Sequence, residues 1–368
     1  MYRAPREPLR IEELWLEPPG PNEVSVRMVA SGVCHSDLHV VDGEWERPRD
    51  LVMGHEGAAI VERLGEGVAE RFPALTTGAL VVLAWTAPCG ACPACRRGEG
   101  WLCAGPIGSG HRLARELARL HRDDGSPIGA YCGIGTFGTR QVVAAEAAVP
   151  VDPQTPVEVA ALIGCAVATG VGAVLRTARV RATESVAIIG LGGVGLSALL
   201  GAVHARADPI VVLDSQQAKL DLARELGATE SILIDSRRAD QALAAATRLV
   251  PEAGGFDHAL ECIGLAATCE LAVQLIRPGG TATLVGMTAQ GVKAGIDVYR
   301  FVEDGKRLLG SDYGSWTPAE AFPFLADLHL AGGLPVERLV SETIPLERVN
   351  DALDGMRHRD GARRVILY

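Results

Sequence analysis

The chain has 368 residues, enough for two domains, and 48% of them are hydrophobic, which indicates a well-buried globular protein. The formal net charge of −10 argues against nucleic acid or an anionic membrane as the main partner. Nine cysteines, with an N-terminal segment MYRAPREPLR that lacks the apolar core of a signal peptide, favour a reducing, cytoplasmic location over a secreted disulfide framework.

Candidate metal ligands occur at two glycine-rich turns in the N-terminal part and once much further along the chain. Cys34 lies in SGVCHSDLHV, His55 precedes Glu56 in VMGHEGAAIVERLGEGV, and Cys165 lies in ALIGCAVATG. Two cysteines and one histidine make a Cys2His set, which leaves a zinc ion one position for water or substrate. Taken singly, each cysteine is equally consistent with a small buried apolar residue, and the histidine with an ordinary hydrogen-bonded side chain.

A second cysteine cluster stands in CGACPACRRGEGWLC, residues 89–103. Its four cysteines are Cys89, Cys92, Cys95 and Cys103. Disulfides at this spacing would be strained, so zinc or an iron–sulfur cluster fits better. Four thiolates leave no open position, so a zinc ion here would be structural and any chemistry would take place elsewhere.

The longest uncharged run, from Val159 to Leu175, is too short and too rich in glycine to be expected to span a bilayer, and it predicts a buried helix. After it, SVAIIGLGGVGLSALLGAVHARADPIVVLD combines an apolar strand, a G-x-G-x-x-G turn, an apolar helix and a second strand that ends at Asp214. This order is typical of a dinucleotide-binding βαβ unit, in which glycines let the backbone approach a pyrophosphate at a helix N-terminus. Asp214 would bind the ribose hydroxyls and repel a 2′-phosphate, which selects NAD over NADP. An ordinary βαβ unit with packing glycines is the alternative.

Residues 167–310 alternate between strand and helix patterns, which predicts a parallel sheet. The expected strands are SVAIIG, PIVVLD, SILID, FDHALECIG and TATLVGM. We therefore predict an α/β protein of two domains: residues 1–166 with 311–368 form a strand-rich domain that carries both metal sites, and residues 167–310 form a doubly wound cofactor domain. Cofactor and zinc are expected to meet between them.

Taken together, these motifs resemble the zinc-containing medium-chain alcohol dehydrogenases of the medium-chain dehydrogenase/reductase superfamily. GVCHSDLHV, GHEGAAIVERLGEGV, the four-cysteine segment, IGCAVATG, GLGGVG and LDSQQAK occur in the family's order. The resemblance implies a Rossmann domain joined to a GroES-like catalytic domain, NAD, and two zinc ions per chain. Cys34, His55 and Cys165 would hold the catalytic zinc, with Glu56 behind it and Asp37 orienting His55. The residues implied for the structural zinc are Cys89, Cys92, Cys95 and Cys103.

The resemblance also implies a path for the substrate's proton and further cofactor contacts. Ser36 and His39 match the hydroxyl and the surface histidine through which relatives release the proton, although a turn serine and a solvated histidine are their ordinary interpretation. Arg363 resembles a C-terminal arginine that reaches the phosphates, with Arg364 as a close rival. The expected cofactor-binding residues are His35, Thr169, Gly190, Gly192, Gly193, Val194, Gly195, Asp214, Lys219 and Arg363.

An apolar substrate pocket with aromatic walls is expected from positions that match substrate-lining residues in relatives. These are Trp45, Trp85, Tyr131, Cys132, Val285 and Met287. Such a pocket suits a primary alcohol or aldehyde with an aliphatic, allylic or aromatic tail. Two alternatives are a thiol-dependent formaldehyde dehydrogenase acting on an S-hydroxymethyl adduct, which the segment LGSDYGS resembles, and a non-catalytic protein that binds NAD and zinc. The segment GVKAGIDVY occupies the position where relatives pair across a two-fold axis, so a homodimer is expected, with a tetramer as the alternative.

Overall fold

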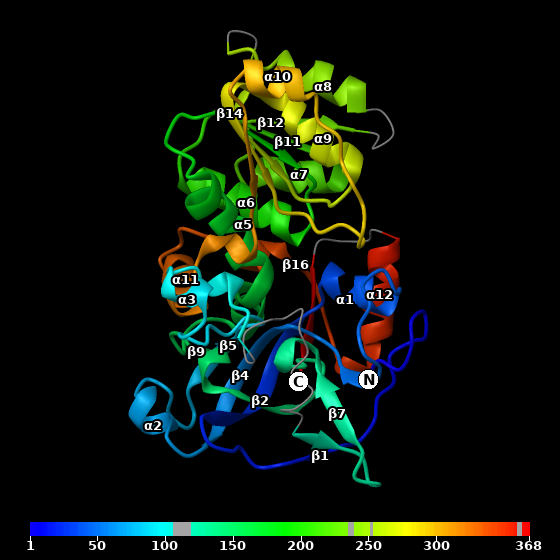
Figure 1. Ribbon diagram of the computed structural model, residues 1–368, viewed down its shortest axis with the longest axis vertical. Helices are drawn as coiled ribbons and strands as arrows, with labels where there is room; N and C mark the ends of the chain where they lie inside the picture. Colours follow the sequence, from blue (N-terminus) through cyan, green and yellow to red (C-terminus); the bar gives the residue numbers. More distant parts are fainter. Residues whose placement is uncertain (106–118, 235–238, 251–252, 359–362) are drawn as a thin grey trace. The chain divides into compact units, whose positions relative to one another are not determined.

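The computed structural model describes residues 1–105, 119–234, 239–250, 253–358 and 363–368 (Figure 1). The chain divides into two compact units: residues 1–165 together with 316–368, and residues 166–315. The metal-ligand candidates all belong to the first unit, and the glycine-rich turn belongs to the second.

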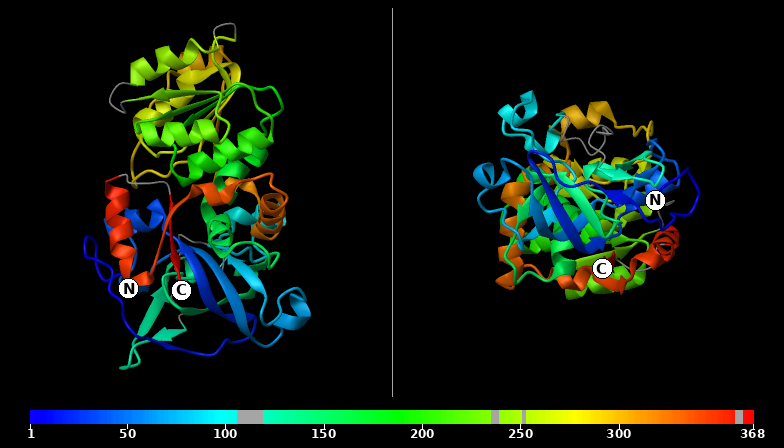
Figure 2. Two further views of the ribbon diagram at one scale, coloured as in Figure 1. Left: turned by 180° about the vertical axis from the view of Figure 1, so that it is seen from behind. Right: turned by 90° about the horizontal axis from the view of Figure 1, so that it is seen from below.

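The larger sheet of the first unit has the strand order β16-β17-β2-β4-β5-β9, and β8 also pairs with β2. Its strands are β2 (Glu23–Gly32), β4 (Glu56–Leu64), β5 (Leu80–Leu83), β8 (Arg140–Ala144), β9 (Ala148–Pro150), β16 (Val340–Ile344) and β17 (Arg363–Leu367). Gly32 pairs with both Glu56 on β4 and Val365 on β17. As a result, the end of β2 and the starts of β4 and β17 meet at one place, with the red C-terminal strand beside β2 (Figure 2).

A smaller sheet in the same unit has the order β1-β6-β7-β3. Its strands are β1 (Trp15–Leu16), β6 (Leu120–His121), β7 (Pro127–Ala130) and β3 (Leu51–Val52). The helices of the unit are α1 (His35–Val41), α2 (Val68–Arg71), α3 (Pro93–Arg96), α4 (Val157–Leu162), α11 (Pro318–Leu330) and α12 (Val349–Arg357). Helices α1 and α12 share an apolar core with Tyr131 and Trp45, which anchors α1 beside the sheet edge.

The second unit is built on a sheet of order β12-β11-β10-β13-β14-β15, parallel throughout. Its strands are β10 (Val186–Ile189), β11 (Ile210–Asp214), β12 (Glu230–Leu233), β13 (Phe256–Glu261), β14 (Ile276–Leu284) and β15 (Arg307–Gly310). The parallel strands expected from the sequence are confirmed, although Asp235 of SILID lies outside the described residues; β15 is an addition at the sheet edge.

Helices accompany this sheet as Figure 1 shows: α5 (Ala168–Gly172), α6 (Gly193–His204), α7 (Gln217–Glu225), α8 (Ala239–Thr247), α9 (Ala266–Leu275) and α10 (Val298–Glu303). Short 3-10 turns complete the described chain: η1 (Gly100–Leu102), η3 (Tyr131–Gly133), η4 (Ala145–Ala147), η7 (Tyr313–Ser315), η8 (Val336–Leu339) and η9 (Leu346–Arg348).

The predicted buried helix is present and longer than its uncharged run. It extends over Val157–Ala178 and contains two π-helical segments, η5 (Ile163–Val167) and η6 (Ala173–Ala178). At 22 residues it has the length and apolar composition of a membrane span, but 83% of its most apolar window is buried inside the protein. That burial is the behaviour of a core helix. Cys165 lies in the first π-helical segment, a local irregularity often found at functional sites.

Candidate metal centres and cofactor-binding site

The three ligands expected for a catalytic zinc converge in the first unit. Cys34 follows β2, His55 immediately precedes β4, and Cys165 lies in η5; all three are buried. One potential ligand atom from each of these residues and from Glu56 lies within 4.8 Å of the others. The Cys165 Sγ and His55 Nε2 are 3.6 Å apart. Zinc–sulfur and zinc–nitrogen bonds of about 2.3 and 2.05 Å at a tetrahedral angle place the two atoms about 3.6 Å apart, so the donor set fits one zinc ion.

Asp37 fixes both the histidine ligand and the turn that carries it. Its Oδ1 lies 3.2 Å from Nδ1 of His55 and accepts the backbone N–H of Gly54 at 3.1 Å, and its Oδ2 accepts the N–H of Cys34 at 3.3 Å. Asp37 is fully buried. This contact assigns the hydrogen of the imidazole to Nδ1 and leaves Nε2 as the electron-pair donor toward the metal. Burial lowers the pKa of His55, but Asp37 and Cys34 outweigh it and hold that pKa well above its ordinary value, so a zinc ion would displace a proton from Nε2 when it binds.

Glu56 and Arg363 form a buried ion pair beside these ligands. The Arg363 guanidinium donates to Glu56 Oε1 and, at 2.9 Å, to the carbonyl oxygen of Val33. Glu56 Oε2 is buried without a hydrogen-bond partner in the described structure. Burial raises the pKa of Glu56, while the Arg363 guanidinium opposes that rise and favours the carboxylate. A Cβ at Gly32 would lie 2.1 Å from Glu56 Oε2, so a glycine is needed where β2 passes this carboxylate.

The four remaining cysteine candidates also come together. Cys92 Sγ and Cys103 Sγ are 3.8 Å apart, which matches the edge of about 3.8 Å expected for two thiolates on one tetrahedral zinc. All four Sγ atoms lie within 4.8 Å of one another, too close to enclose a multi-iron cluster, so a single ion fits best. The backbone N–H groups of Cys89 and Cys92 point at Cys103 Sγ and Cys89 Sγ, each at 3.3 Å, as expected for thiolate acceptors.

The expected proton-relay residues lie on α1, next to the metal candidates. Ser36 and His39 are both partly exposed. His39 Nδ1 is 2.5 Å from Oε2 of Glu44, and its ring stacks on Trp45 with centroids 4.6 Å apart. Glu44 was not among the residues expected from the sequence; an acidic residue five positions after a candidate histidine, across a Gly43 turn, is a weak signal that could have pointed to it.

Each glycine of the G-x-G-x-x-G turn can be given its own physical reason for being a glycine. Gly190 has φ +93°, and a Cβ at Gly195 would lie 1.7 Å from the carbonyl oxygen of Gly190, so the turn and the helix packing require both. A Cβ at Gly192, the N-cap of α6, would meet nothing within 4 Å. Protein packing therefore does not require Gly192, and the open space lets a pyrophosphate approach the helix N-terminus.

Asp214 stands at the end of β11, where the ribose contact was expected. Its Oδ2 accepts the N–H of Leu191 at 2.7 Å, and its Oδ1 accepts the N–H of Gln216 at 2.9 Å. The glycine-rich turn itself thus holds the carboxylate in place. Gly193 and Val194 form the first turn of α6, Thr169 lies buried in α5, and Lys219 lies half-exposed on α7. His35, at the start of α1, is exposed.

The two C-terminal arginines have different partners in the structure. Arg363 is engaged with Glu56, whereas Arg364 pairs with Glu342 at 3.0 Å. Arg363 is therefore the one next to the metal candidates, and its expected contact with the phosphates remains a prediction.

The expected pocket residues fall into two groups. In the first unit, Trp45, Trp85 and Tyr131 are buried and Cys132 is half-buried; in the second, Val285 is buried and Met287 is 49% exposed after β14. Tyr131 packs edge-on against His55, with ring centroids 5.6 Å apart. This contact places one aromatic residue directly beside a ligand, and the substrate-lining role of the set remains a prediction.

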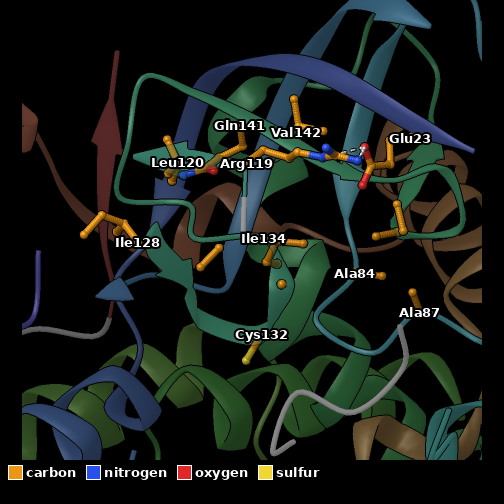
Figure 3. Close-up of a pocket in the computed structure, with 14 residues that line it drawn as sticks. Glu23, Ala84, Ala87, Arg119, Leu120, Ile128, Cys132, Ile134, Gln141 and Val142 are labelled. Carbon is orange, nitrogen blue, oxygen red and sulfur yellow. Dashed lines mark hydrogen bonds and ion pairs between the residues drawn. The ribbon is translucent and has the colours of Figure 1, made fainter. Parts of the chain in front are cut away.

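A cavity of about 50 Å³ lies elsewhere in the first unit (Figure 3). Arg119 extends across it to Glu23, with which it pairs at 2.9 Å, and Cys132 lies at its other side. None of the catalytic ligand candidates lines it, and it has room for a few water molecules only.

Comparison with known proteins agrees with this geometry. Residues 20–153 match the model of the alcohol dehydrogenase GroES-like domain family, and residues 193–329 match that of the zinc-binding dehydrogenases. The S-(hydroxymethyl)glutathione dehydrogenase of Haemophilus influenzae is 33% identical, over 99% of this chain and 95% of the relative. The chain belongs to the zinc-containing medium-chain alcohol dehydrogenase family, whose cofactors are zinc and NAD(P).

Two solved structures extend the likeness over the whole chain. An alcohol dehydrogenase zinc-binding domain protein from Burkholderia ambifaria has a TM-score of 0.91 and 33% identity, covering 99% of this chain and 96% of that one. The benzyl alcohol dehydrogenase of Acinetobacter calcoaceticus has a TM-score of 0.88 and 29% identity, covering 99% and 97%. The GroES-like and Rossmann folds expected from the sequence are confirmed.

Proposed function

We propose that the protein is an alcohol dehydrogenase that interconverts a primary alcohol, with an aliphatic, allylic or aromatic tail, and its aldehyde, using NAD. The observation that carries this proposal is the convergence of Cys34, His55 and Cys165 on one point, with Asp37 orienting the histidine. Three protein ligands leave a tetrahedral ion one position for substrate, which a purely structural site does not need. A non-catalytic binder would need neither that open position nor Ser36 and His39.

The chain's own residues supply orientation and proton transfer. Zinc, when bound, acts as a Lewis acid that lowers the pKa of a substrate hydroxyl. Ser36 would accept the substrate's hydroxyl proton and His39 would pass a proton to solvent, and NAD, when bound, would supply the acceptor for the substrate's hydride. Asp37 holds His55 in one tautomer throughout, and Glu56 with Arg363 provides a fixed, dry electrostatic background behind the ligands.

A second candidate function is the oxidation of an S-hydroxymethyl thiol adduct. The S-(hydroxymethyl)glutathione dehydrogenases among the relatives favour it, and so does Arg47, whose guanidinium lies 6.0 Å from the ring centroid of Trp45. An arginine beside a predicted pocket wall could bind the carboxylate of a thiol cosubstrate. Trp45 and Trp85 themselves favour an apolar tail, as does the likeness to the benzyl alcohol dehydrogenase.

The test is turnover with a panel of alcohols and aldehydes, with and without low-molecular-weight thiols. Activity with apolar alcohols alone supports the first proposal, and activity with formaldehyde only when thiol is present supports the second. Ser36→Ala should cripple alcohol oxidation while zinc content and NADH binding stay near the parent's. His39→Gln should cost about ten-fold, because water can partly replace a positioned base at the solvent end. Near-normal turnover of Ser36→Ala would contradict the relay.

We further propose a homodimer in the cytoplasm. On α10 and the edge strand β15, Val298, Tyr299, Val302, Leu308 and Leu309 are all exposed, an apolar surface that a second copy could cover. None of the nine cysteines, all of which lie in the described residues, forms a disulfide, which supports a reducing compartment. Light scattering on the protein in solution would separate a dimer from a tetramer or a monomer.

A further inference from the structure

The segment after α1 folds back tightly onto His39. The backbone N–H groups of Glu44 and Trp45 both donate to the carbonyl oxygen of His39, at 2.8 and 3.1 Å. This returns the side chains of the two residues to the imidazole ring. Glu44 Oε2 lies 2.5 Å from Nδ1, the Trp45 ring stacks at an interplanar angle of 23°, and His35 meets the ring edge-on at 4.9 Å.

These contacts distinguish the two ring nitrogens. A carboxylate can only accept a hydrogen bond, so Nδ1 of His39 carries the hydrogen in the neutral ring. No hydrogen bond to Nε2 is present in the part of the chain that the structure describes. The side chain of His39 is 13% exposed and that of Glu44 48%, so the pair lies at the surface with the imidazole itself mostly covered. Trp45, 3% exposed, provides the rigid wall that fixes the ring plane.

We propose that Glu44 is a positioning residue for proton release: by accepting the Nδ1–H of His39, it leaves Nε2 as the atom that takes up the substrate's proton. The proposal rests on the proposed function, in which His39 is the solvent end of the relay. A proton arriving at Nε2 makes an imidazolium whose charge the carboxylate stabilises, and Nε2 then returns that proton to water. The hydrogen on Nδ1 remains in place, so the ring is restored without a flip.

Other charged groups also lie near this loop. Asp42 at the end of α1 pairs with Arg357 of α12 at 2.5 Å, and Arg357 also pairs with Asp354. Arg47 lies over the Trp45 ring. Arg6 and Glu7 line the same surface groove as Glu44, and His35 is the titratable neighbour on His39's own helix. Glu44 is thus the acidic group that is hydrogen-bonded to the ring, and the test must separate its effect from theirs.

The first measurement is the pH dependence of kcat for alcohol oxidation. In Glu44→Gln the amide oxygen still accepts the Nδ1–H, but the negative charge is lost. The acid limb should move to lower pH because the imidazolium loses a partly exposed counter-charge, and the plateau should fall only a few-fold. Glu44→Ala also loses the hydrogen bond, and its plateau should fall about ten-fold. Glu46→Gln removes the same charge two residues away and should leave the profile at the parent's position.

The second measurement asks whether the effect passes through His39. In a His39→Gln background, Glu44→Gln should change neither the plateau nor the acid limb, because the group it positions is gone. Zinc content and the Kd for NADH should equal the parent's in every variant. A merely structural role for Glu44 would lower activity by the same factor in both backgrounds, and that result would overturn the proposal, as would a Glu44→Gln profile identical to the parent's.

The third measurement needs no turnover and separates failure of this proposal from failure of the proposed function. In ¹⁵N-histidine-labelled protein, with His39 assigned by His39→Gln, the neutral ring should show Nδ1 protonated and Nε2 unprotonated. In Glu44→Ala, which has no acceptor for the Nδ1–H, the share of the Nδ1–H tautomer should fall, whereas Glu46→Gln should keep the parent's pattern. An Nε2–H tautomer in the parent, or a tautomer pattern that does not respond to Glu44→Ala, would overturn the proposal even if alcohols prove to be the substrates. The predicted pattern in a protein that turns over no alcohol would refute the proposed function alone.

Discussion

Removal of the carboxylate at Asp214 should weaken the choice of NAD over NADP. Both oxygens of Asp214 are held by backbone N–H groups, at 2.7 Å from Leu191 and 2.9 Å from Gln216, so the carboxylate cannot swing away from an incoming 2′-phosphate. Two unit charges about 4 Å apart at an effective dielectric constant of about 20 repel by about 4 kcal/mol. That energy corresponds to a factor of about 10³, so the parent should prefer NAD by at least roughly this ratio in kcat/KM.

Asp214→Gly should therefore reduce the preference at least ten-fold, and by at most about 10³-fold. The assay is kcat/KM for both cofactors, together with Kd values for NADH and NADPH from nicotinamide fluorescence. Asp221→Asn, which removes a charge on the exposed face of α7, is the matched control and should leave the ratio within about two-fold. A parent ratio near one, or an Asp214→Gly variant with the parent's ratio, would refute the reasoning.

Two further predictions concern metal and pH. Metal analysis of the purified protein should give close to two zinc ions per chain. Cys103→Ser should lose one zinc ion and stability, and Cys34→Ser should lose activity while staying folded. A folded Cys103→Ser variant that keeps both zinc ions would contradict the assignment of the four cysteines to a closed structural site. Burial raises the pKa of Asp312 from 3.8 to about 6, so the folded state loses stability as pH rises through about 6. That pKa difference of about 2.2 corresponds to roughly 3 kcal/mol at most. Asp312→Asn should therefore unfold at a higher denaturant concentration than the parent at pH 8 and at the parent's concentration near pH 4. Equal unfolding midpoints of variant and parent at both pH values would refute this prediction.

The features that could be predicted from the sequence were those whose functional residues all lie within one short segment. Gly190, Gly192 and Asp214 lie within one βαβ unit, so their spacing alone places them at a helix N-terminus and a strand end. The four cysteines between residues 89 and 103 likewise need only one tight loop to meet. The long buried helix was detectable because its uncharged run is apolar on every face, although its ends, Val157 and Ala178, lie outside that run.

What the sequence could not show depends on the register between distant strands. Arg363 and Glu56 are 307 residues apart and meet because Gly32 pairs with both Glu56 and Val365. No local pattern encodes that register. The edge strand β15 was missed for a different reason. All its residues are exposed, and its short segment lacks the apolar alternation of a half-buried strand.

The buried pair of Glu56 and Arg363 is better explained by electrostatics than by stability. A buried ion pair is commonly no more stabilising than well-packed apolar residues of the same size, since both charges must be desolvated. Here the pair lies beside two candidate metal-binding cysteines and a buried Asp37, so a lone Glu56 carboxylate would add a further negative charge at the candidate ligands. Arg363 cancels that charge and, through Val33, is tied to the strand end from which Cys34 follows. The same register that joins β17 to β2 therefore sets both the position of a candidate ligand and the charge around it, which is why Arg363, five positions before Tyr368, lies at the site.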